Sequence, residues 1–538
     1  MDWAYELAAS VDGAQVVNDS KTPSGTVHVG SLRGPVIHDA IWRALRVRGL
    51  EARFLYGVDD LDAMDSAALL TPDAVERSMG MPLSRVPAPA GSDAPSYARH
   101  FVGNLFFPTF QRLGIRPEFY WMSEFYESGA FDPYIRRALD RAATVRALYR
   151  RVSRVEKPAG WLPVQVICEN CGRIGTTVAT DWDGETVAYH CDPTAVAWAR
   201  GCNHAGRIAP FHGNAKLPFN LDWAAKWTHF NVTIEGCGKD LATAGGSRDR
   251  SDAISREVYE REPPRNVAYE FLNVGGRKMS TSKGTGAAAH TIAEVVPPEQ
   301  LRFLFLRPRP NQAIEFDPDG TDAIPRLFDE YDRIADAAAG REVKGELPPN
   351  PDRLFASSLV DPNADIAAEA AAFRPPFLHL SLILQSGKDP KVYFEAEKGS
   401  ALTLREREIL AARIAAVEGW LASYAPDSAK YAVVTGELPP EVSRLADEQR
   451  HYLAVLALAA EEERPAGGQA WQALIFRVAG DAQMPAGRAF GALYVAFLGR
   501  PNGPRAGWLL ASLDFEFVLA RLKEAGGLGR VTAGEGPR

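Results

Sequence analysis

The sequence lacks any long run of apolar residues. No uninterrupted apolar stretch in its 538 residues is long enough to span a bilayer. Met1 to Leu7 carries Asp and Glu and has no apolar core of secretory length. Pro and Gly are scattered along the chain, and no low-complexity tract, solenoid period or coiled-coil period stands out. These absences predict a globular, cytoplasmic protein with no membrane part.

Cysteine is scarce, with five in the whole chain, four of them between Cys168 and Cys202. So few cysteines make a poor disulfide framework for a long chain without an export signal. Cys168-x2-Cys171, followed by Cys191, Cys202 and His204, offers thiolate and imidazole ligands that suit tetrahedral Zn²⁺. We therefore predict a structural zinc site, with free buried thiols as the alternative. The spacing leaves open whether Cys191 and Cys202 are alternative or joint ligands.

An excess of positive charge is also lacking, because 60 Lys and Arg face 68 Asp and Glu, which gives a net charge of −8 at pH 7. This argues against a protein that is basic all over. RNA is held by local basic patches, however, so the overall balance neither supports nor excludes a nucleic-acid partner.

At 538 residues the chain is too long for one hydrophobic core. In its first half, short apolar runs alternate with longer amphipathic stretches, which is typical of a parallel α/β sheet. This pattern predicts strands at 14–17, 52–57, 119–122 and 228–234, and helices at 35–49, 97–113 and 131–152.

The pattern changes from about Gly340, where a Pro-rich joint at 346–351 leads into long helical periodicities such as 404–424 and 441–463. The second half is therefore predicted to be all α. The predicted domains are an α/β domain at 1–165 and 214–300, a cysteine-rich insertion at 166–213, a connecting stem at 301–345 and a helical region at 346–538.

A segment suited to anion binding follows the first predicted strand and precedes the first predicted helix. It reads Thr22-Pro23-Ser24-Gly25-Thr26-Val27-His28-Val29-Gly30. At such a turn, free backbone N–H groups and the helix dipole face the ligand, and His28 adds a donor for a phosphate oxygen. Taken alone, a turn of this kind is more often structural.

A second segment, Gly275 to Gly284, holds Lys278 and Lys283 with small hydroxyl residues between them. Such a loop can close over a triphosphate and stabilise the charge that develops as pyrophosphate leaves. The alternative is a solvated basic loop. That alternative does not explain why one α/β chain carries this segment after the segment Thr22 to Gly30.

These segments resemble two signatures of class I aminoacyl-tRNA synthetases: His28-Val29-Gly30-Ser31 is similar to HIGH, and Lys278-Met279-Ser280-Thr281-Ser282 to KMSKS. Further segments resemble the class I lysyl-tRNA synthetases in particular, namely Thr22 to Gly25, Asp59-Asp60-Leu61-Asp62, Met79-Gly80-Met81-Pro82 and Gly238-Lys239-Asp240. Leu241 is a departure, because the family carries His after the last of these.

The resemblance implies a Rossmann-type catalytic domain, a helical anticodon-binding region, ATP and Mg²⁺ as cofactors, and lysine and tRNA(Lys) as partners. It places ATP against Pro23, Ser24, Gly25, His28, Gly30, Lys278, Met279, Ser280, Ser282 and Lys283, of which His28, Lys278 and Lys283 would be catalytic. Thr22 and Tyr269 would lie in the lysine pocket, joined by one of Trp223 and Trp227.

A lysine ammonium also needs a carboxylate, since an unpaired buried cation is costly. Asp59 and Asp60, with Asp62, are the candidates, and for any one of them a place in a solvated turn is the alternative. Two other functions stay open: a class I synthetase for another amino acid such as glutamate, and a non-catalytic paralogue that binds tRNA.

Overall fold

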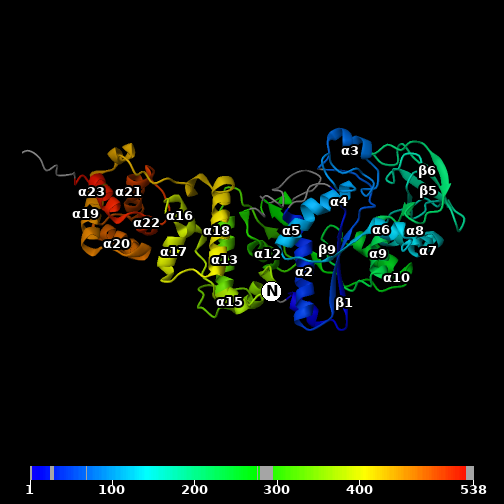
Figure 1. The fold of residues 1–538 in the computed structure, drawn as a ribbon, viewed down its shortest axis with the longest axis horizontal. Coiled ribbons are helices and arrows are strands. Elements are labelled where there is room, and N and C mark those ends of the chain that lie inside the picture. The colour runs from blue at the N-terminus through cyan, green and yellow to red at the C-terminus, as the bar shows by residue number, and fades with distance from the viewer. Residues whose placement is uncertain are drawn as a thin grey trace, which may run out of the picture. The chain divides into compact units, whose positions relative to one another are not determined.

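The computed structural model describes residues 3–24, 29–67, 69–274, 277, 278, 292 and 295–528, with only the backbone for 29, 274, 277 and 278. The chain divides into two compact units (Figure 1). Unit 1 comprises Met1–Phe316 and Ile334–Ala367, and unit 2 comprises Asp317–Arg333 and Ala368–Arg538.

A parallel sheet forms the centre of unit 1. Strands β1 (Gln15–Lys21), β2 (Ala52–Val58) and β3 (Glu118–Trp121) pair in parallel in the order β1-β2-β3. Beyond β1, single parallel bridges join Val17 to Ile234 and Ile234 to Arg265. The two segments that contain Ile234 and Arg265 pair again a few residues later, as β9 (Cys237–Gly238) and β10 (Ala268–Tyr269). The resulting order, β3-β2-β1-β9-β10, is that of a Rossmann-type sheet and confirms the predicted fold class.

Helices connect these strands and cover the sheet. The 15-residue helix α2 carries an apolar face that packs on β1 and β2. The helices of unit 1 are α1 (Trp3–Ala9), η1 (Val29–Leu32), α2 (Arg33–Val47), α3 (Pro72–Ser78), α4 (Tyr97–Phe101), η2 (Val102–Phe106), α5 (Phe107–Arg112), α6 (Met122–Glu127), α7 (Asp132–Asp140), α8 (Ala142–Ser153), α9 (Phe219–His229), α10 (Ser247–Glu257), α12 (Pro298–Leu306) and α14 (Pro351–Ser358).

Three of the four predicted strands are present, but the strand predicted at 228–234 is wrong. Thr228 and His229 end helix α9, Asn231 turns the chain with a φ of 53°, and Ile234 alone pairs with β1. Short apolar runs do not distinguish a buried helix end from a strand, which explains the error.

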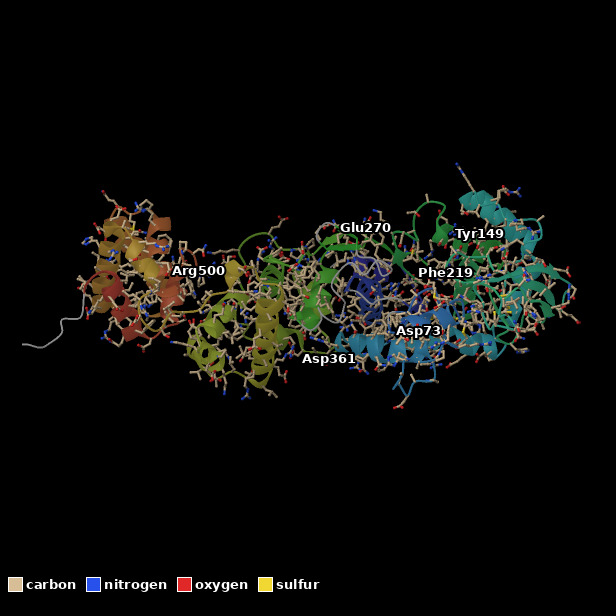
Figure 2. All side chains as sticks on the ribbon, turned by 90° about the horizontal axis from the view of Figure 1, so that it is seen from above. Asp73, Tyr149, Phe219, Glu270, Asp361 and Arg500 are labelled. Carbon is tan, nitrogen blue, oxygen red and sulfur yellow. The ribbon has the colours of Figure 1, made fainter. Side chains whose placement is uncertain are left out.

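The predicted helices exist with interruptions. The predicted segment 97–113 is helical from Tyr97 to Arg112, with a π-helical turn at η2 between α4 and α5. The segment 131–152 breaks at Arg141 into α7 and α8. Tyr149 of α8 lies near Phe219 at the start of α9 (Figure 2), and its hydroxyl donates to Asn220 Oδ1 at 3.4 Å.

The segment between α8 and α9 carries a small antiparallel sheet. Strands β5 (Thr177–Trp182), β6 (Val187–Cys191) and β7 (Ala205–Ile208) pair in the order β5-β6-β7. At its base, β4 (Gln165–Val166) pairs with β8 (Ala215–Lys216). A further small sheet, in the order β12-β11-β13, joins β11 (Leu272–Val274), β12 (Arg277–Lys278) and β13 (Ile314–Glu315).

The second half is helical, as predicted: the described residues after β13 contain no strand. Helices α13 (Ala323–Ala338) and α15 (Ile366–Ala371) cross the division between the units. Unit 2 holds α16 (Phe377–Gln385), α17 (Pro390–Lys398), α18 (Leu404–Ser423), η4 (Asp427–Ala429), η5 (Pro440–Arg444), α19 (Asp447–Glu463), α20 (Gly467–Asp481), α21 (Ala486–Leu498), α22 (Ala506–Ala511) and α23 (Phe515–Ala525). None of the described helices combines the length and apolar character that crossing a membrane requires.

Candidate active site

The carboxyl ends of the parallel strands bring several of the predicted site residues to one edge of the sheet. Thr22 follows β1, Asp59 and Asp60 follow β2, Gly238 ends β9 and Tyr269 ends β10. The strand order reverses between β1 and β9, and in open α/β sheets ligands bind in the crevice at such a switch point. This edge is therefore the candidate active site.

Part of the predicted ATP site lies outside the described residues, namely Gly25, His28, Met279, Ser280, Ser282 and Lys283. Pro23 is buried in the turn after β1, where Ser24 N donates to Thr22 O at 2.9 Å. Gly30 lies in η1 directly before α2. The backbone of Lys278 belongs to β12, which pairs with β11.

Each carboxylate of the acidic run after β2 already has a partner within the chain. Asp59 is 5% exposed and forms an ion pair of 2.5 Å with Lys226. Asp62 pairs with Lys216 and accepts a hydrogen bond of 2.5 Å from Thr22 Oγ1. The predicted lysine-pocket residue Thr22 is thus held by Asp62, at the end of β1.

Asp60 is bound to the helix that follows β3. Its carboxylate accepts hydrogen bonds from the backbone N–H and the hydroxyl of Ser123, at 2.8 and 2.6 Å. Burial is the main cause that raises the pKa of Asp60 to about 6, although the bonds from Ser123 act against it. Asp60 therefore anchors α6 to the loop after β2.

Lys226 is the central cation of this edge, and it was missed in the sequence. It is 0% exposed and lies 3.1 Å from Asp222, one helical turn earlier in α9. Burial alone would lower the pKa of Lys226, but Asp59 and Asp222 outweigh it and raise the pKa well above the usual value. A signal was available, because Asp222 and Lys226 have the i,i+4 spacing of a helical ion pair.

The two predicted pocket tryptophans also have internal partners. The indole N–H of Trp223 donates to one oxygen of Glu235 at 2.9 Å, and that of Trp227 to the other at 2.6 Å. Both rings are buried, at 4% and 0% exposed. Their contact with a lysine substrate stays a prediction.

Arg33, at the start of α2, connects segments that are far apart in sequence. Its guanidinium donates to the carbonyls of Glu270, Phe271, Arg309, Pro310 and Gln312 at 2.6 to 3.4 Å. Burial lowers its pKa to about 10, so it remains a cation. Arg33 thus holds the segment that leads into β11 and β12 against the start of α2. No sequence signal identifies this role, since all five acceptors are backbone atoms.

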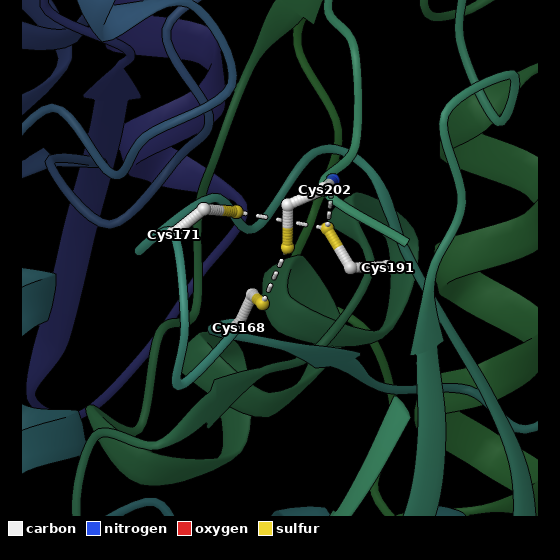
Figure 3. A group of neighbouring side chains, drawn as sticks. All are labelled: Cys168, Cys171, Cys191 and Cys202. Atoms are coloured by element: carbon white, nitrogen blue, oxygen red, sulfur yellow. Dashed lines mark hydrogen bonds between the residues drawn. The ribbon is translucent and has the colours of Figure 1, made fainter. Parts of the chain in front are cut away.

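The structure brings together the four cysteines of the inserted segment, Cys168, Cys171, Cys191 and Cys202 (Figure 3). All four sulfurs lie within 4.8 Å of one another, with Cys168 3.6 Å from Cys202 and Cys171 3.7 Å from Cys191. Zinc–sulfur bonds of about 2.3 Å at tetrahedral angles would separate the sulfurs by about 3.8 Å. The geometry therefore fits a closed four-thiolate zinc site, and His204 does not belong to the group.

Hydrogen-bond donors surround these sulfurs. Cys202 N lies 3.3 Å from Cys191 Sγ, and Thr176 Oγ1 lies 3.2 Å from the same sulfur. Asn170 Nδ2 donates to Cys202 Sγ at 3.4 Å. Donors of this kind stabilise thiolates, the form in which cysteine binds zinc.

The cysteine group is linked to the acidic run through Gly80. Ile174 N and Gly175 N both donate to Gly80 O, at 2.7 and 3.1 Å, and Gly80 N donates to Met64 O at 2.9 Å. Gly80 has a φ of 83°, and a Cβ there would lie 3.2 Å from the Cβ of Ala199. The positive φ strains any residue with a side chain, and the contact with Ala199 leaves little room for one, so both features favour glycine here. A metal in the cysteine group would hold the inserted segment against the loop after β2.

We predict that the purified protein holds about one zinc ion per chain and that Cys168→Ser loses most of it, because a closed set of four thiolates does not tolerate the loss of one. Thermal unfolding of the variant should begin at a lower temperature. Cys237→Ser is the matched control, since Cys237 lies outside the group and should leave the zinc content unchanged. Full zinc content in Cys168→Ser would refute the site.

Comparison with known proteins gives matches along almost the whole chain. The family model described as "tRNA synthetases class I (K)" matches residues 1–350. A protein named "Lysine--tRNA ligase" from Methanosarcina barkeri (strain Fusaro / DSM 804) is 32% identical over 546 residues, which cover 97% of each chain. One of the same name from Archaeoglobus fulgidus is 32% identical over 98% of this chain and 100% of its own.

A solved structure, a glutamate tRNA ligase from Elizabethkingia meningosepticum, covers 95% of this chain and 99% of its own, at 12% identity and a TM-score of 0.41. That match is too distant to indicate a function. The family model and the two archaeal relatives each match more than half of the chain.

Proposed function

The chain belongs to the class I (K) tRNA synthetase family, and we propose from this premise that it is a lysine–tRNA ligase. The enzyme would activate lysine with ATP and transfer it to tRNA(Lys). The observation that carries the proposal is the match, over nearly all of both chains, to relatives that have this name.

The reaction would proceed in two steps at the carboxyl edge of the sheet. The lysine carboxylate attacks the α-phosphate of ATP and displaces pyrophosphate, and the terminal ribose hydroxyl of the tRNA then attacks the adenylate and releases AMP. Neither step forms a bond to the protein. The chain's residues therefore act by positioning the reactants and stabilising charge, with Mg²⁺ neutralising phosphate oxygens when bound.

Pyrophosphate exchange, measured with each amino acid in turn, tests this proposal. Lysine should support exchange and glutamate should not, because the candidate residues at this edge include carboxylates, which repel an anionic side chain. Exchange with glutamate but not lysine would overturn the lysine assignment. No exchange with any amino acid would favour a tRNA-binding paralogue.

The tRNA would also need unit 2, which contains a cavity of about 670 Å³ between α16, α18 and α22. Its lining includes the aromatic rings of Trp420, Tyr431 and Trp508, the half-exposed side chain of Leu378 and the guanidinium of Arg505. Arg505 is exposed and lies 5.3 Å from the centre of the Trp508 ring. Unstacked RNA bases bind to aromatic faces and arginine planes of this kind.

The polarity of this cavity is compatible with a neutral base. Burial, with a smaller contribution from the charge of Arg505, lowers the pKa of His379 to about 4. At neutral pH His379 is therefore an uncharged imidazole that can donate or accept one hydrogen bond. We assign the cavity to an unstacked base of the tRNA.

Arg505→Ala is expected to raise the KM for tRNA about 5- to 100-fold, because stacking on a base contributes about 1 to 3 kcal/mol. Lysine-dependent pyrophosphate exchange, measured at saturating tRNA, should be unchanged. Arg477→Ala is the matched control, since Arg477 is also exposed in unit 2 but does not line the cavity. Equal tRNA kinetics in Arg505→Ala and the wild type would contradict the assignment.

A further inference from the structure

One carboxylate at the active-site edge is buried without a hydrogen bond to one of its oxygens. Asp19, in β1, is 8% exposed, and no described residue donates a hydrogen bond to its Oδ2. Its Oδ1 accepts only from the neighbouring Ser20 N, at 2.9 Å. Burial of a carboxylate oxygen without a hydrogen-bond donor costs free energy, so a functional role is needed to explain it.

The nearest cationic candidate is a histidine that is committed elsewhere. His38 Nδ1 lies 3.4 Å from Asp19 Oδ2, but it is only 2.8 Å from Gly34 O. Gly236 N donates to His38 Nε2 at 2.8 Å. Burial alone would lower the pKa of His38, but the nearby Asp19 carboxylate raises it. Nε2 accepts from Gly236, so the Nδ1 proton is directed to Gly34 O, and Asp19 Oδ2 receives no hydrogen bond from this ring.

Lys21 is the other cation to consider, because it lies two residues further on and shares a face of β1 with Asp19. Burial lowers the pKa of Lys21, and Asp19 offsets this only in part. No ion pair within 4 Å joins the two side chains in the described part of the chain.

Asp19 shares a space with Tyr269, the residue predicted to line the lysine pocket. A Cβ on Gly34 would lie 2.7 Å from Tyr269 Oη and 3.2 Å from Asp19 Oδ2. The Tyr269 hydroxyl therefore packs directly against Gly34, at the start of α2, with the Asp19 carboxylate beside it. Carboxylate and phenol oxygens both accept hydrogen bonds from an ammonium group.

The other carboxylates of this edge are occupied. Asp59 and Asp62 pair with Lys226 and Lys216, Asp60 accepts from Ser123, and Glu235 accepts from two indoles. We propose that Asp19, assisted by Tyr269, binds the side-chain ammonium of the amino-acid substrate. This inference rests on the proposed function and deepens it, because it names the group that selects a cationic side chain.

The position of Asp19 along β1 distinguishes the two ammonium groups of lysine. The substrate carboxylate must meet the α-phosphate, which binds beyond the carboxyl end of the strand. Asp19 lies three residues before Thr22, which is about 10 Å along a strand. The group that reaches Asp19 is therefore the far end of the substrate, its side chain.

The Asp19→Asn variant tests the proposal, because asparagine has the shape of aspartate but carries no charge. The KM for lysine in pyrophosphate exchange should rise about 10- to 100-fold, which corresponds to the loss of one charge-assisted hydrogen bond, while the KM for ATP stays the same. The melting temperature should stay equal or rise, because an unpaired buried charge is removed. Asp12→Asn, an exposed carboxylate in the loop before β1, is the control that should change neither.

Two lysine analogues identify the ammonium that Asp19 binds. Inhibition by 6-aminohexanoate, which keeps only the side-chain ammonium, should weaken in Asp19→Asn, whereas inhibition by norleucine, which keeps only the α-ammonium, should not. The reverse result would overturn the assignment. The assignment would also be overturned if Asp19→Asn had a lower melting temperature and an unchanged KM for lysine. That result would make Asp19 an internal counter-ion of Lys21. Failure of the wild type to use lysine would instead refute the proposed function.

Discussion

Lys226→Met is expected to lower the free energy of unfolding by about 3 to 5 kcal/mol, because it leaves two buried carboxylates without their shared cation. Lys226 Nζ lies 2.5 Å from Asp59 and 3.1 Å from Asp222. Tyr126 Oη donates to Asp222 at 2.5 Å, and one hydroxyl cannot replace an ammonium. Urea unfolding, followed by tryptophan fluorescence at neutral pH, measures the loss.

The pH dependence of this loss gives a sharper result. Lys226 has a raised pKa, so its contribution to stability is full at neutral pH and disappears only in strong alkali. Without Lys226, the two carboxylates should titrate at a higher pH in the folded protein than in the unfolded chain. The variant should therefore recover more of its stability than the wild type as the pH falls from 8 to 5, because in the wild type burial raises the pKa of Asp59 alone, while Lys226 and Lys216 hold that of Asp222 below its usual value.

Lys239→Met is the matched control, because Lys239 forms an exposed ion pair of 2.6 Å with Glu270. Its removal should cost at most about 1 kcal/mol. If both variants lose equally little stability, the buried cluster does not hold the loop after β2 against α9, and the structural role assigned to Lys226 is wrong.

The sequence predicted the parts of this fold whose signals are local. β1 and β2 are short apolar runs on either side of the longer amphipathic helix α2, so their type and order could be read directly. The cysteine group was predictable from the spacing of Cys168 and Cys171, since paired thiols have few other uses in such a chain. In the structure the motif residues Thr22 and Asp59 lie at the same edge, because the parallel strands β1 and β2 end together.

The missing information concerns partners that are distant in sequence. Lys226 lies 167 residues from Asp59, and nothing local to either residue links them. Arg33 binds backbone carbonyls, which every residue carries. The unpaired state of Asp19 follows from what its neighbours already bind, which only the three-dimensional contacts show.

The largest expected effect on catalysis belongs to Lys278→Ala, which should slow adenylate formation about 10²- to 10³-fold. The loss of one preorganised donor to charge that develops in the transition state has this size. The backbone of Lys278 pairs with Asn273 of β11, and Asn273 Nδ2 donates to Glu315 of β13 at 2.6 Å. The sheet β12-β11-β13 therefore fixes the point where the second signature begins, next to the segment that Arg33 holds.

The rate of exchange at saturating lysine and ATP measures this effect. The KM for lysine should change less than about threefold, because an interaction made only in the transition state lowers kcat and leaves ground-state binding alone. Lys278→Arg, which keeps the charge with a different shape, should retain an intermediate rate. Lys391→Ala removes an exposed lysine from α17 and should have no effect. Unchanged exchange in Lys278→Ala would show that the loop after β12 does not act on the leaving pyrophosphate, whereas a raised KM with an unchanged rate would assign Lys278 to substrate binding alone.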